Sequence, residues 1–470
     1  STSLKEPDMF IYFSELLMYK NPYIHRWVIV GTMVIAIVCN YLDRQLLSIL
    51  KPEILGHFNI GDIEFAWILN VFLICYAVMY PVSGILVDKF GPKPVMFGGI
   101  AAWSLACIGG GLSQDVYQFA VCRGILGLAE PTIFTGQLVA VTLWFEKRTR
   151  ATANSICQAG GSIGTMCAPL AVAWMVRYFP WQDVFIIAGV AGLIIAGIWW
   201  IVYRRPRQEF LAVTLGEPKG TTLRDTRSFS VGALFGTSAL WGVLLIRLVS
   251  DPVWYFINFW LPGFLRDLGV EQGLGVQETL DMIQYIGGIP FLVGATCGVL
   301  ASAYSDKLVA KGWNALKSRK AVMSLSACVA PVIALVPLLS HWHSVSFTLR
   351  LGLITAVFAI VAFMCLVWLY NIGVVIAETF PVKNVATVAG IACGAGAVGA
   401  ACFNLVVGSL MATMGEYLFY CMGFLHPIAT IVLLRLVKPA EPQLEKCETY
   451  SIDSDENNDN DVCGLDAAPN

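Results

Sequence analysis

The chain has 470 residues, of which 57% are apolar and 13% are charged, and its formal net charge is −2. Soluble domains carry about a quarter charged residues, so this composition, with a mean hydropathy of +0.70, excludes an ordinary water-soluble domain. Apolar windows of about 20 residues, long enough to cross roughly 30 Å of hydrocarbon, recur along most of the chain. The sequence therefore predicts an integral membrane protein.

Twelve membrane spans are predicted, separated by clusters of Gly, Pro and charged residues. They begin near Trp27, Glu64, Pro94, Val116, Ala151, Asp183, Ala239, Ile283, Lys320, Thr348, Asn384 and Glu416. The longest hydrophilic stretch within this series separates six spans from six. The predicted fold is all-α and consists of a cytoplasmic segment over 1–26, a six-helix half over 27–203, a cytoplasmic linker over 204–238, a second six-helix half over 239–437 and a disordered acidic tail over 438–470.

Lysine and arginine give the predicted orientation. The loops after even-numbered spans are basic and contain Lys89, Lys93, Lys147, Arg148, Arg150, Lys307, Lys311 and Lys383, and the linker contains several more. The loops after odd-numbered spans contain few such residues. Because basic loops stay on the cytoplasmic side, both termini are predicted to be cytoplasmic. The expected location is a cell membrane, either a plasma membrane or a bacterial inner membrane.

The first span contains two adjacent charges, Asp43 and Arg44. An ionisable residue at membrane depth costs at least about 2.5 kcal/mol to insert, so both are functional candidates. Neighbouring residues on a helix point about 100° apart, so we expect them to serve different partners; the alternative is a structural pair near a helix end. Tyr41 shares a face with Arg44, which sets a phenolic hydroxyl beside a guanidinium. That combination suits an oxidised, hydroxyl-bearing anion.

The fourth span has the clearest polar stripe. Arg123, Gly127, Glu130 and Gln137 follow at spacings of four, three and seven, which places them on one helical face. A planar guanidinium matches a carboxylate in bidentate fashion, so Arg123 is a candidate substrate ligand. Glu130 and Asp43 are the candidate proton carriers, because burial favours the neutral carboxyl and a nearby arginine favours the charged one. The alternative is a purely structural contact between Arg123 and Glu130.

Four further residues are candidates for substrate binding. Tyr76 lies on the second span, Gln158 in the Gly-rich start of the fifth, and Trp368 and Asn371 three residues apart on the tenth. An aromatic ring packs on the C–H face of a sugar, and an amide bonds to its hydroxyls. Aromatic residues in membrane helices also serve as packing or interface anchors.

An internal repeat relates the two halves. Residues 145–164 align with 380–399 without a gap, which makes the fifth span equivalent to the eleventh. Asp88-Lys89 and Asp306-Lys307 form a second equivalent pair at the cytoplasmic ends of spans two and eight. Secondary transporters are built from such repeats and bind substrate near the midplane between them.

These motifs resemble those of a known family. The loop Gly84-Ile-Leu-Val-Asp88-Lys89-Phe-Gly91-Pro-Lys93 is similar to the signature loop of the major facilitator superfamily. Within that superfamily, the segments 40–44, 123–131 and 251–262 resemble the anion:cation symporters, above all the hexuronate and sugar-acid branch, which itself resembles the vesicular glutamate and sialic acid carriers of animals. The resemblance implies import of a hexuronate or aldonate by proton symport through alternating access, with Arg123 linked to substrate or proton.

The signature loops are expected to gate the cytoplasmic side. Asp88, with Lys89 and Lys93, can pair across to the eleventh span when that side is closed, and Arg148 can do the same in a neighbouring loop. Asp306 is the equivalent of Asp88 in the second half. Two positions depart from the family pattern, with Ser302 in place of a glycine and Glu378 in place of an aspartate.

Two other functions are compatible with these residues. Arg44 and Arg247 can bracket a phosphate, as in an organophosphate:phosphate antiporter, although an exchanger has no need of proton-carrying carboxylates. The second is a transporter-like sensor that signals through its tails. No enzyme is expected, because no nucleophile and base lie at a suitable spacing. The expected partners are a small anionic substrate and the lipid bilayer, with protons as the coupling ion, no metal or other cofactor, no nucleic acid, and a monomeric chain.

Overall fold

A computed structural model describes residues 21–215 and 228–439. All regular structure in these two ranges is helical, and twelve segments are long and apolar enough to cross a membrane. The prediction of an all-α protein with twelve spans is therefore confirmed. All but the first two residues of the predicted acidic tail, and most of the predicted N-terminal segment, lie outside the described residues.

The first half comprises eight helices. They are α2 (Pro22–Ile49), α3 (Lys51–Phe58), α4 (Asp62–Phe90), α5 (Pro92–Leu112), α6 (Val116–Ala129), α7 (Pro131–Trp144), α8 (Arg150–Met175) and α9 (Trp181–Val202). The helix of the first span, α2, begins five residues before the expected Trp27. Its start is fixed by Pro22 at the first helical position and by the Asn21 side chain, which accepts a hydrogen bond from the Tyr23 N–H at 3.0 Å.

The linker also contains helical structure. Two short helices, α10 (Gln208–Leu215) and α11 (Val231–Phe235), lie within the stretch predicted as a linker. The second half then comprises α12 (Ser238–Glu271), α13 (Val276–Ile286), α14 (Ile289–Ala310), α15 (Ala315–Ala327), the 3-10 turn η1 (Ala330–Ala334), α16 (Leu335–Ser340), α17 (Phe347–Thr379), the 3-10 turn η2 (Val382–Asn384) and α18 (Val385–Leu436). The eleventh and twelfth spans both belong to α18.

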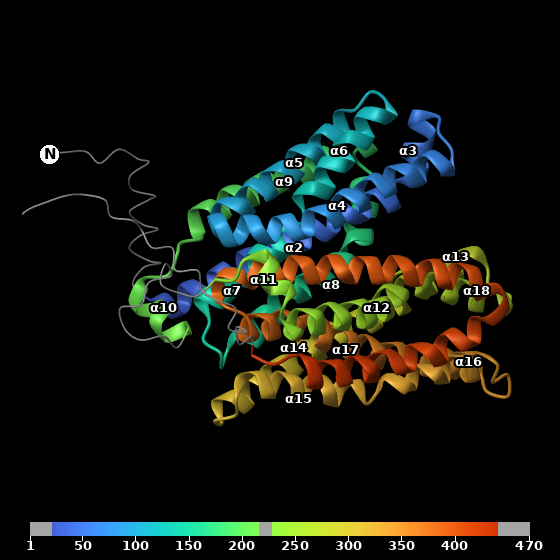
Figure 1. The fold of residues 1–470 in the computed structure, drawn as a ribbon. Helices are drawn as coiled ribbons and strands as arrows, with labels where there is room; N and C mark the ends of the chain where they lie inside the picture. Colours follow the sequence, from blue (N-terminus) through green and yellow to red (C-terminus); the bar gives the residue numbers. More distant parts are fainter. Residues whose placement is uncertain (1–20, 216–227, 440–470) are drawn as a thin grey trace, which may run out of the picture. The chain divides into compact units, whose positions relative to one another are not determined.

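Each half has its own packing. Helix α5 packs on α9 and α2 on α8, whereas α12 packs on α18 and α14 on α17 (Figure 1). One cluster of buried apolar side chains belongs to α2–α9 and the segments beside them, and a second belongs mainly to α11–α18. The halves meet where α4 contacts α18 and where α8 contacts α14 and α17.

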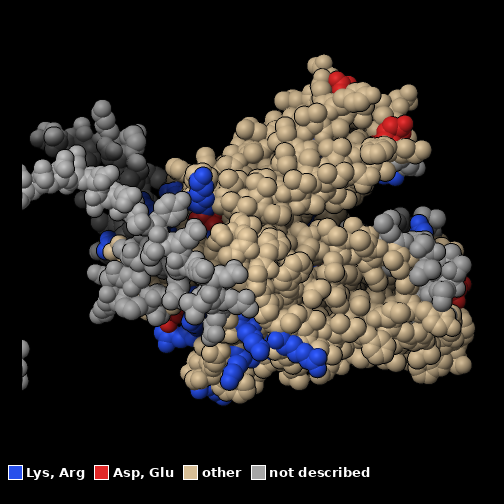
Figure 2. All heavy atoms as spheres, viewed as in Figure 1, with Lys and Arg blue, Asp and Glu red and all other residues tan. Residues whose placement is uncertain are grey.

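The outward-facing side chains are those of a lipid-exposed protein. Trp67, Leu105 and Ile194 are exposed by 65%, 58% and 60%, a pattern that water would penalise and hydrocarbon accepts. Figure 2 shows that the visible Lys and Arg side chains gather mainly toward the end of the molecule where α10 and the α14–α15 connection lie. This is the end predicted to be cytoplasmic.

The seam between α4 and α18 depends on glycine. A Cβ added at Gly390 would lie 2.3 Å from the carbonyl oxygen of Tyr80, and one at Gly84 would lie 2.2 Å from that of Ala386. Both contacts are with backbone atoms, which cannot move aside as a flexible side chain can. Small residues of this kind allow membrane helices to approach closely.

We expect Gly390→Ala to separate α18 from α4 and to lower stability by about 1–3 kcal/mol, the usual range for overpacking. Gly98→Ala on α5 is the matched control, because nothing lies within 4 Å of a Cβ at that position. Thermal unfolding of the purified variants measures the effect. Equal melting temperatures for the two variants would contradict the close contact at this seam.

Candidate substrate site and cytoplasmic gate

The fourth span is broken at its centre. Helix α6 ends at Ala129, Glu130 occupies the junction, and Pro131 starts α7. Proline has no N–H, so it cannot continue the hydrogen-bond ladder of the preceding turn. The junction places the Glu130 carboxyl, which is 0% exposed, in the interior of the first half.

Arg44 of α2 is the cation at this junction. Its Nε donates to Glu130 Oε2 at 2.6 Å, and its Nη2 donates to the Tyr76 hydroxyl at 2.7 Å. Tyr76 in turn shares a hydrogen bond of 2.7 Å with the hydroxyl of Tyr80, one turn along α4. The Arg44 side chain remains 23% exposed. The guanidinium is therefore held by a carboxylate and a phenol but keeps an open side.

Aromatic faces surround the same guanidinium. Its central carbon lies 4.5 Å from the ring centre of Tyr76, 5.1 Å from that of Tyr41, and 5.7 Å from that of Phe134. Tyr41 fits against α8 because position 161 is glycine; a Cβ there would lie 2.7 Å from the Tyr41 ring. Cation–π contact and hydrogen bonding thus fix Arg44 in one orientation.

Asp43 faces a different environment from its neighbour. It is 1% exposed, one of its oxygens lies 4.0 Å from the Cys107 sulfur of α5, and the other has no hydrogen-bond partner among the described residues. Asp43 and Arg44 therefore contact different helices, as the 100° turn between neighbours requires. The alternative of a structural pair formed by these two residues has no support in this geometry.

Arg123 lies close to Asp43 but bonds differently from the expectation. Its guanidinium lies 5.3 Å from the ring centre of Phe119 and 4.9 Å from that of Phe185, and it interacts electrostatically with Asp43 and Glu130. Glu130 forms its ion pair with Arg44 instead. The alternative of a structural contact between Arg123 and Glu130 is not present as a hydrogen bond or ion pair, because seven residues span about 10 Å along a helix axis. The break at Pro131 also ends the common face of the stripe.

A second cation and carboxylate lie in the other half. On α12, Arg247 Nη1 is 3.1 Å from Asp251 Oδ1, and both residues are less than 10% exposed. A Cβ at Gly396 of α18 would lie 2.1 Å from Asp251, so glycine makes room for this pair. Arg247 Nη2 also lies 3.4 Å from the Cys393 sulfur, one turn along α18 from Gly390, which packs on Tyr80. Tyr80 is bonded to Tyr76, the hydroxyl partner of Arg44. The two arginines thus converge on one region between the halves.

The amide candidates divide into two groups. Gln137 donates to Asn154 at 2.9 Å, and Asn154 donates to the Tyr370 carbonyl at 2.6 Å, which connects α7 and α8 to α17 across the seam. Gln158 is half-buried on α8. Asn371 of α17 is fully buried and donates to the Ser302 hydroxyl of α14 at 3.0 Å. Both helices belong to the second half.

Trp368 is placed differently from the prediction. It is 2% exposed, its indole N–H donates to the Met323 carbonyl at 2.9 Å, and its ring lies edge-on to His426. The structure brings it together with α15 and α18 and not with the Arg44 cluster. The spacing from Asn371 identified a shared face, but that face is used for packing within the second half.

Two aspartates join the halves at the predicted cytoplasmic end. Asp88, near the end of α4, accepts hydrogen bonds from the Ala386 N–H at 3.1 Å and the Thr387 N–H at 2.7 Å, which belong to the first turn of α18. Asp306 of α14 accepts from the Thr152 N–H at 2.7 Å and its hydroxyl at 2.6 Å, in the first turn of α8. The first turn of a helix favours a negative charge. Each half therefore supplies a carboxylate to a helix start of the other.

Asp306 and Asp88 differ in the cations that lie near them. Asp306 is 2.8 Å from Arg319, a fully buried residue of α15 that also lies 3.4 Å from Glu378 and bonds to the Lys147 carbonyl. Near Asp88, the Lys89 ammonium lies over the Phe90 ring and the Lys93 ammonium over the Trp200 ring. Both rings belong to the first half, whereas these lysines were expected to help Asp88 pair across to the eleventh span. Arg148 is 62% exposed and pairs with Glu146 in its own loop. The sequence does not single out Arg319, which lies at the end of a loop rich in lysine and arginine.

Asp306→Asn is expected to destabilise the protein more than Asp88→Asn. Removing one partner of a buried ion pair costs about 3–5 kcal/mol, and of its two carboxylate contacts Arg319 would keep only the longer one, with Glu378. The hydrogen bonds of Asp88 to described residues come from backbone N–H groups, and asparagine can still accept one of them, so about 1 kcal/mol is expected. Thermal unfolding of both variants compares them. The reverse order of stability would show that Arg319 does not depend on Asp306.

Known proteins share this architecture and sequence. The family model of the Major Facilitator Superfamily matches residues 33–372. The chain belongs to the Major Facilitator Superfamily, so it is a multi-pass membrane transport protein and not an enzyme. The resemblance of the signature loop to that superfamily is thereby confirmed.

The most similar relatives include three bacterial transporters. The chain is 28% identical to the galacturonate transporter of Dickeya chrysanthemi, over 64% of this chain and 88% of that protein. It is 29% identical to the hexuronate transporter of Escherichia coli K12, over 64% and 70%. It is 30% identical to the probable L-galactonate transporter of the same strain, over 64% and 66%.

Two solved structures have the same fold. The proton:xylose symporter XylE superimposes with a TM-score of 0.68 at 14% identity, over 89% of this chain and 97% of that one. The Escherichia coli fucose:proton symporter FucP superimposes with a TM-score of 0.60 at 13% identity, over 87% and 98%. At these identities the likeness concerns the fold alone.

Proposed function

We propose that the chain imports a sugar acid, a hexuronate or an aldonate, together with protons, across a bacterial inner membrane or plasma membrane. The substrate class follows the relatives, which are named as galacturonate, hexuronate and probable galactonate transporters. Alternating access between the two halves is the mechanism, and no cofactor besides the coupling proton takes part.

The charge balance of the site carries this proposal. Three buried or half-buried arginines, Arg44, Arg123 and Arg247, are matched by three buried carboxylates, Asp43, Glu130 and Asp251. An entering anion adds a charge that nothing in this set compensates. Burying such a charge is costly, and a proton that enters with the anion removes the cost.

Arg44 is the proposed first contact of the substrate. A substrate carboxylate that reaches its open side competes with Glu130 for the guanidinium. Glu130 would then be a buried carboxylate without its ion pair, which is several kcal/mol less stable than the paired state unless it takes up a proton. Asp43 is the proposed site of a second proton. Tyr41, Tyr76 and Gln158 would serve the substrate hydroxyls.

The same balance makes an organophosphate:phosphate antiporter the weaker candidate. Arg44 and Arg247 do converge, but each is already paired with a carboxylate. A phosphate dianion between them would leave two negative charges uncompensated. A sugar monoacid adds one negative charge, which the proton on Glu130 compensates.

Uptake into proteoliposomes tests the proposal. Labelled galacturonate, galactonate and glucose 6-phosphate are offered with and without an inside-alkaline pH gradient, and xylose is the uncharged control. We expect the two sugar acids to accumulate under the gradient and a protonophore to prevent it. Glucose 6-phosphate entry that needs internal phosphate and ignores the pH gradient would instead establish the antiporter.

A further inference from the structure

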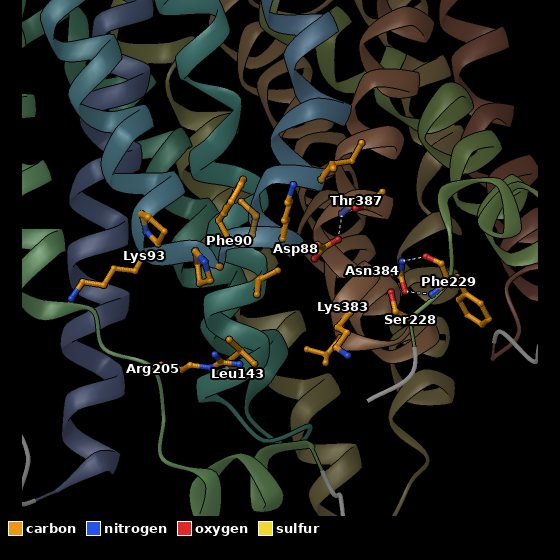
Figure 3. A pocket seen from close by; sticks show the side chains of 18 of the residues that line it. Asp88, Phe90, Lys93, Leu143, Arg205, Ser228, Phe229, Lys383, Asn384 and Thr387 are labelled. Carbon is orange, nitrogen blue, oxygen red and sulfur yellow. Dashed lines mark hydrogen bonds between the residues drawn. The ribbon is translucent and has the colours of Figure 1, made fainter. Parts of the chain in front are cut away.

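A pocket of about 620 Å³ opens at the predicted cytoplasmic end. Its walls come from the α4–α5 turn, from α7, from the chain after α9, from residues 228–231 and from η2 and the start of α18 (Figure 3). The volume is that of a small-ligand site. The pocket lies away from the Arg44 cluster, and the transport mechanism makes no use of its volume.

The pocket lining has an excess of positive charge. Lys89, Lys93, Arg205 and Lys383 line it, with Asp88 as the single acidic residue. Both oxygens of Asp88 accept hydrogen bonds, one from the Ala386 N–H and one from the Thr387 N–H, so the carboxylate is already used by the start of α18. Lys89, Lys93 and Arg205 form no ion pair with any residue that the structure describes. Figure 3 shows Arg205 and Lys383 on either side of the pocket, with Asp88 above them.

We propose that this pocket binds a phosphoryl group and that the bound group favours the closed cytoplasmic side. Arginine binds phosphate through its fork of donors, and lysine does so as a point charge. The ligand is either a soluble phosphate compound or the headgroup of a phospholipid. Inorganic phosphate and the monoester headgroup of phosphatidic acid present the same phosphoryl group, which carries up to two negative charges.

The bound group is expected to favour the closed cytoplasmic side because the residues that line the pocket come from both halves. Lys89 and Lys93 belong to the first half, and Arg205 follows its last helix α9. Lys383 lies in η2, four residues after the tenth span α17 of the second half. Next to Lys383, the Asn384 amide bonds to both the N–H and the carbonyl of Phe229, at 2.8 and 2.9 Å, which fixes that wall. A ligand that contacts both halves binds better when the halves are together, and it shifts the population toward that state.

The double variant Arg205→Ala with Lys383→Ala tests the site in the full-length protein. The matched control is Lys311→Ala with Lys317→Ala, which removes two exposed cytoplasmic charges outside the pocket. Binding of inorganic phosphate is measured by equilibrium dialysis, and retention of dioleoyl phosphatidic acid by native mass spectrometry. We expect the pocket variant to lose about tenfold or more in affinity and the control to match the parent. Sugar-acid binding and gel filtration establish that both variants are folded.

The two probes identify the source of the phosphoryl group. Phosphate binding places a soluble compound in the pocket, and retention of phosphatidic acid without phosphate binding places a lipid there. Binding of neither probe, or equal losses in both double variants, would overturn the proposal, because the charges would then act only as a diffuse basic surface. The bound probe is also expected to slow sugar-acid uptake by the parent and not by the pocket variant. Unchanged uptake despite binding would overturn the link to the gate.

Discussion

Arg44→Lys is expected to lower the affinity for a sugar acid by about a hundredfold. Arg44 bonds to Glu130 through Nε and to Tyr76 through Nη2, and both nitrogens belong to one rigid plane. Lysine has a single ammonium, so it cannot hold both partners and also offer a donor to a substrate. Two lost hydrogen bonds to charged groups, at about 1.5 kcal/mol each, give that factor.

Substrate titration of the purified variant measures this loss. Arg266→Lys is the matched control, because the Arg266 side chain is 67% exposed and lies outside the cluster. An Arg44→Lys variant that binds substrate like the parent would contradict the role of the planar guanidinium. Restored binding after a second change of Glu130→Gln would place the defect in the ion pair and not in the substrate contact.

Glu130→Gln and Asp43→Asn are each expected to abolish accumulation driven by a pH gradient while exchange of labelled for unlabelled substrate continues. Both amides imitate the protonated, neutral carboxyl, so the variant carrier can bind and release substrate but cannot release a proton. A gradient of one pH unit supplies a factor of about ten in accumulation for each coupled proton. Because the empty carrier is expected to return only after both sites have released their protons, replacing either carboxyl removes the whole of this accumulation.

The pH dependence has a defined sign. Uptake by the parent is expected to rise as the external pH falls, because loading requires proton binding from that side. Uptake by the variants is expected to be independent of external pH. If both variants concentrate substrate under the gradient as the parent does, then neither residue carries the proton.

The sequence was sufficient for the fold and for part of the site. The lengths of the apolar windows were enough to predict the twelve spans. The angle of 100° between adjacent residues on a helix predicted that Asp43 and Arg44 contact different partners. The internal repeat placed Asp88 and Asp306 as equivalent residues, and the structure gives both the same kind of contact with a helix start of the other half. These features depend on local periodicity and on symmetry, which a single sequence contains.

The remaining features depend on which helix faces which. Trp368 and Asn371 share a face, but only the packing of α17 against α15 and α14 decides that this face is internal to the second half. Glu130 bonds to Arg44, 86 residues away, and not to Arg123 on its own span. The Arg319–Asp306–Glu378 cluster likewise joins three helices. No spacing within one helix predicts such contacts.

Proton movement driven by substrate alone tests the central claim most directly. Proteoliposomes that enclose a pH indicator, with equal pH on both sides and the membrane potential held at zero, receive external galacturonate. Proton symport predicts that the interior becomes acidic as galacturonate enters, and that Glu130→Gln prevents this acidification. Galacturonate entry without any change of internal pH would contradict proton coupling and the charge balance on which it rests.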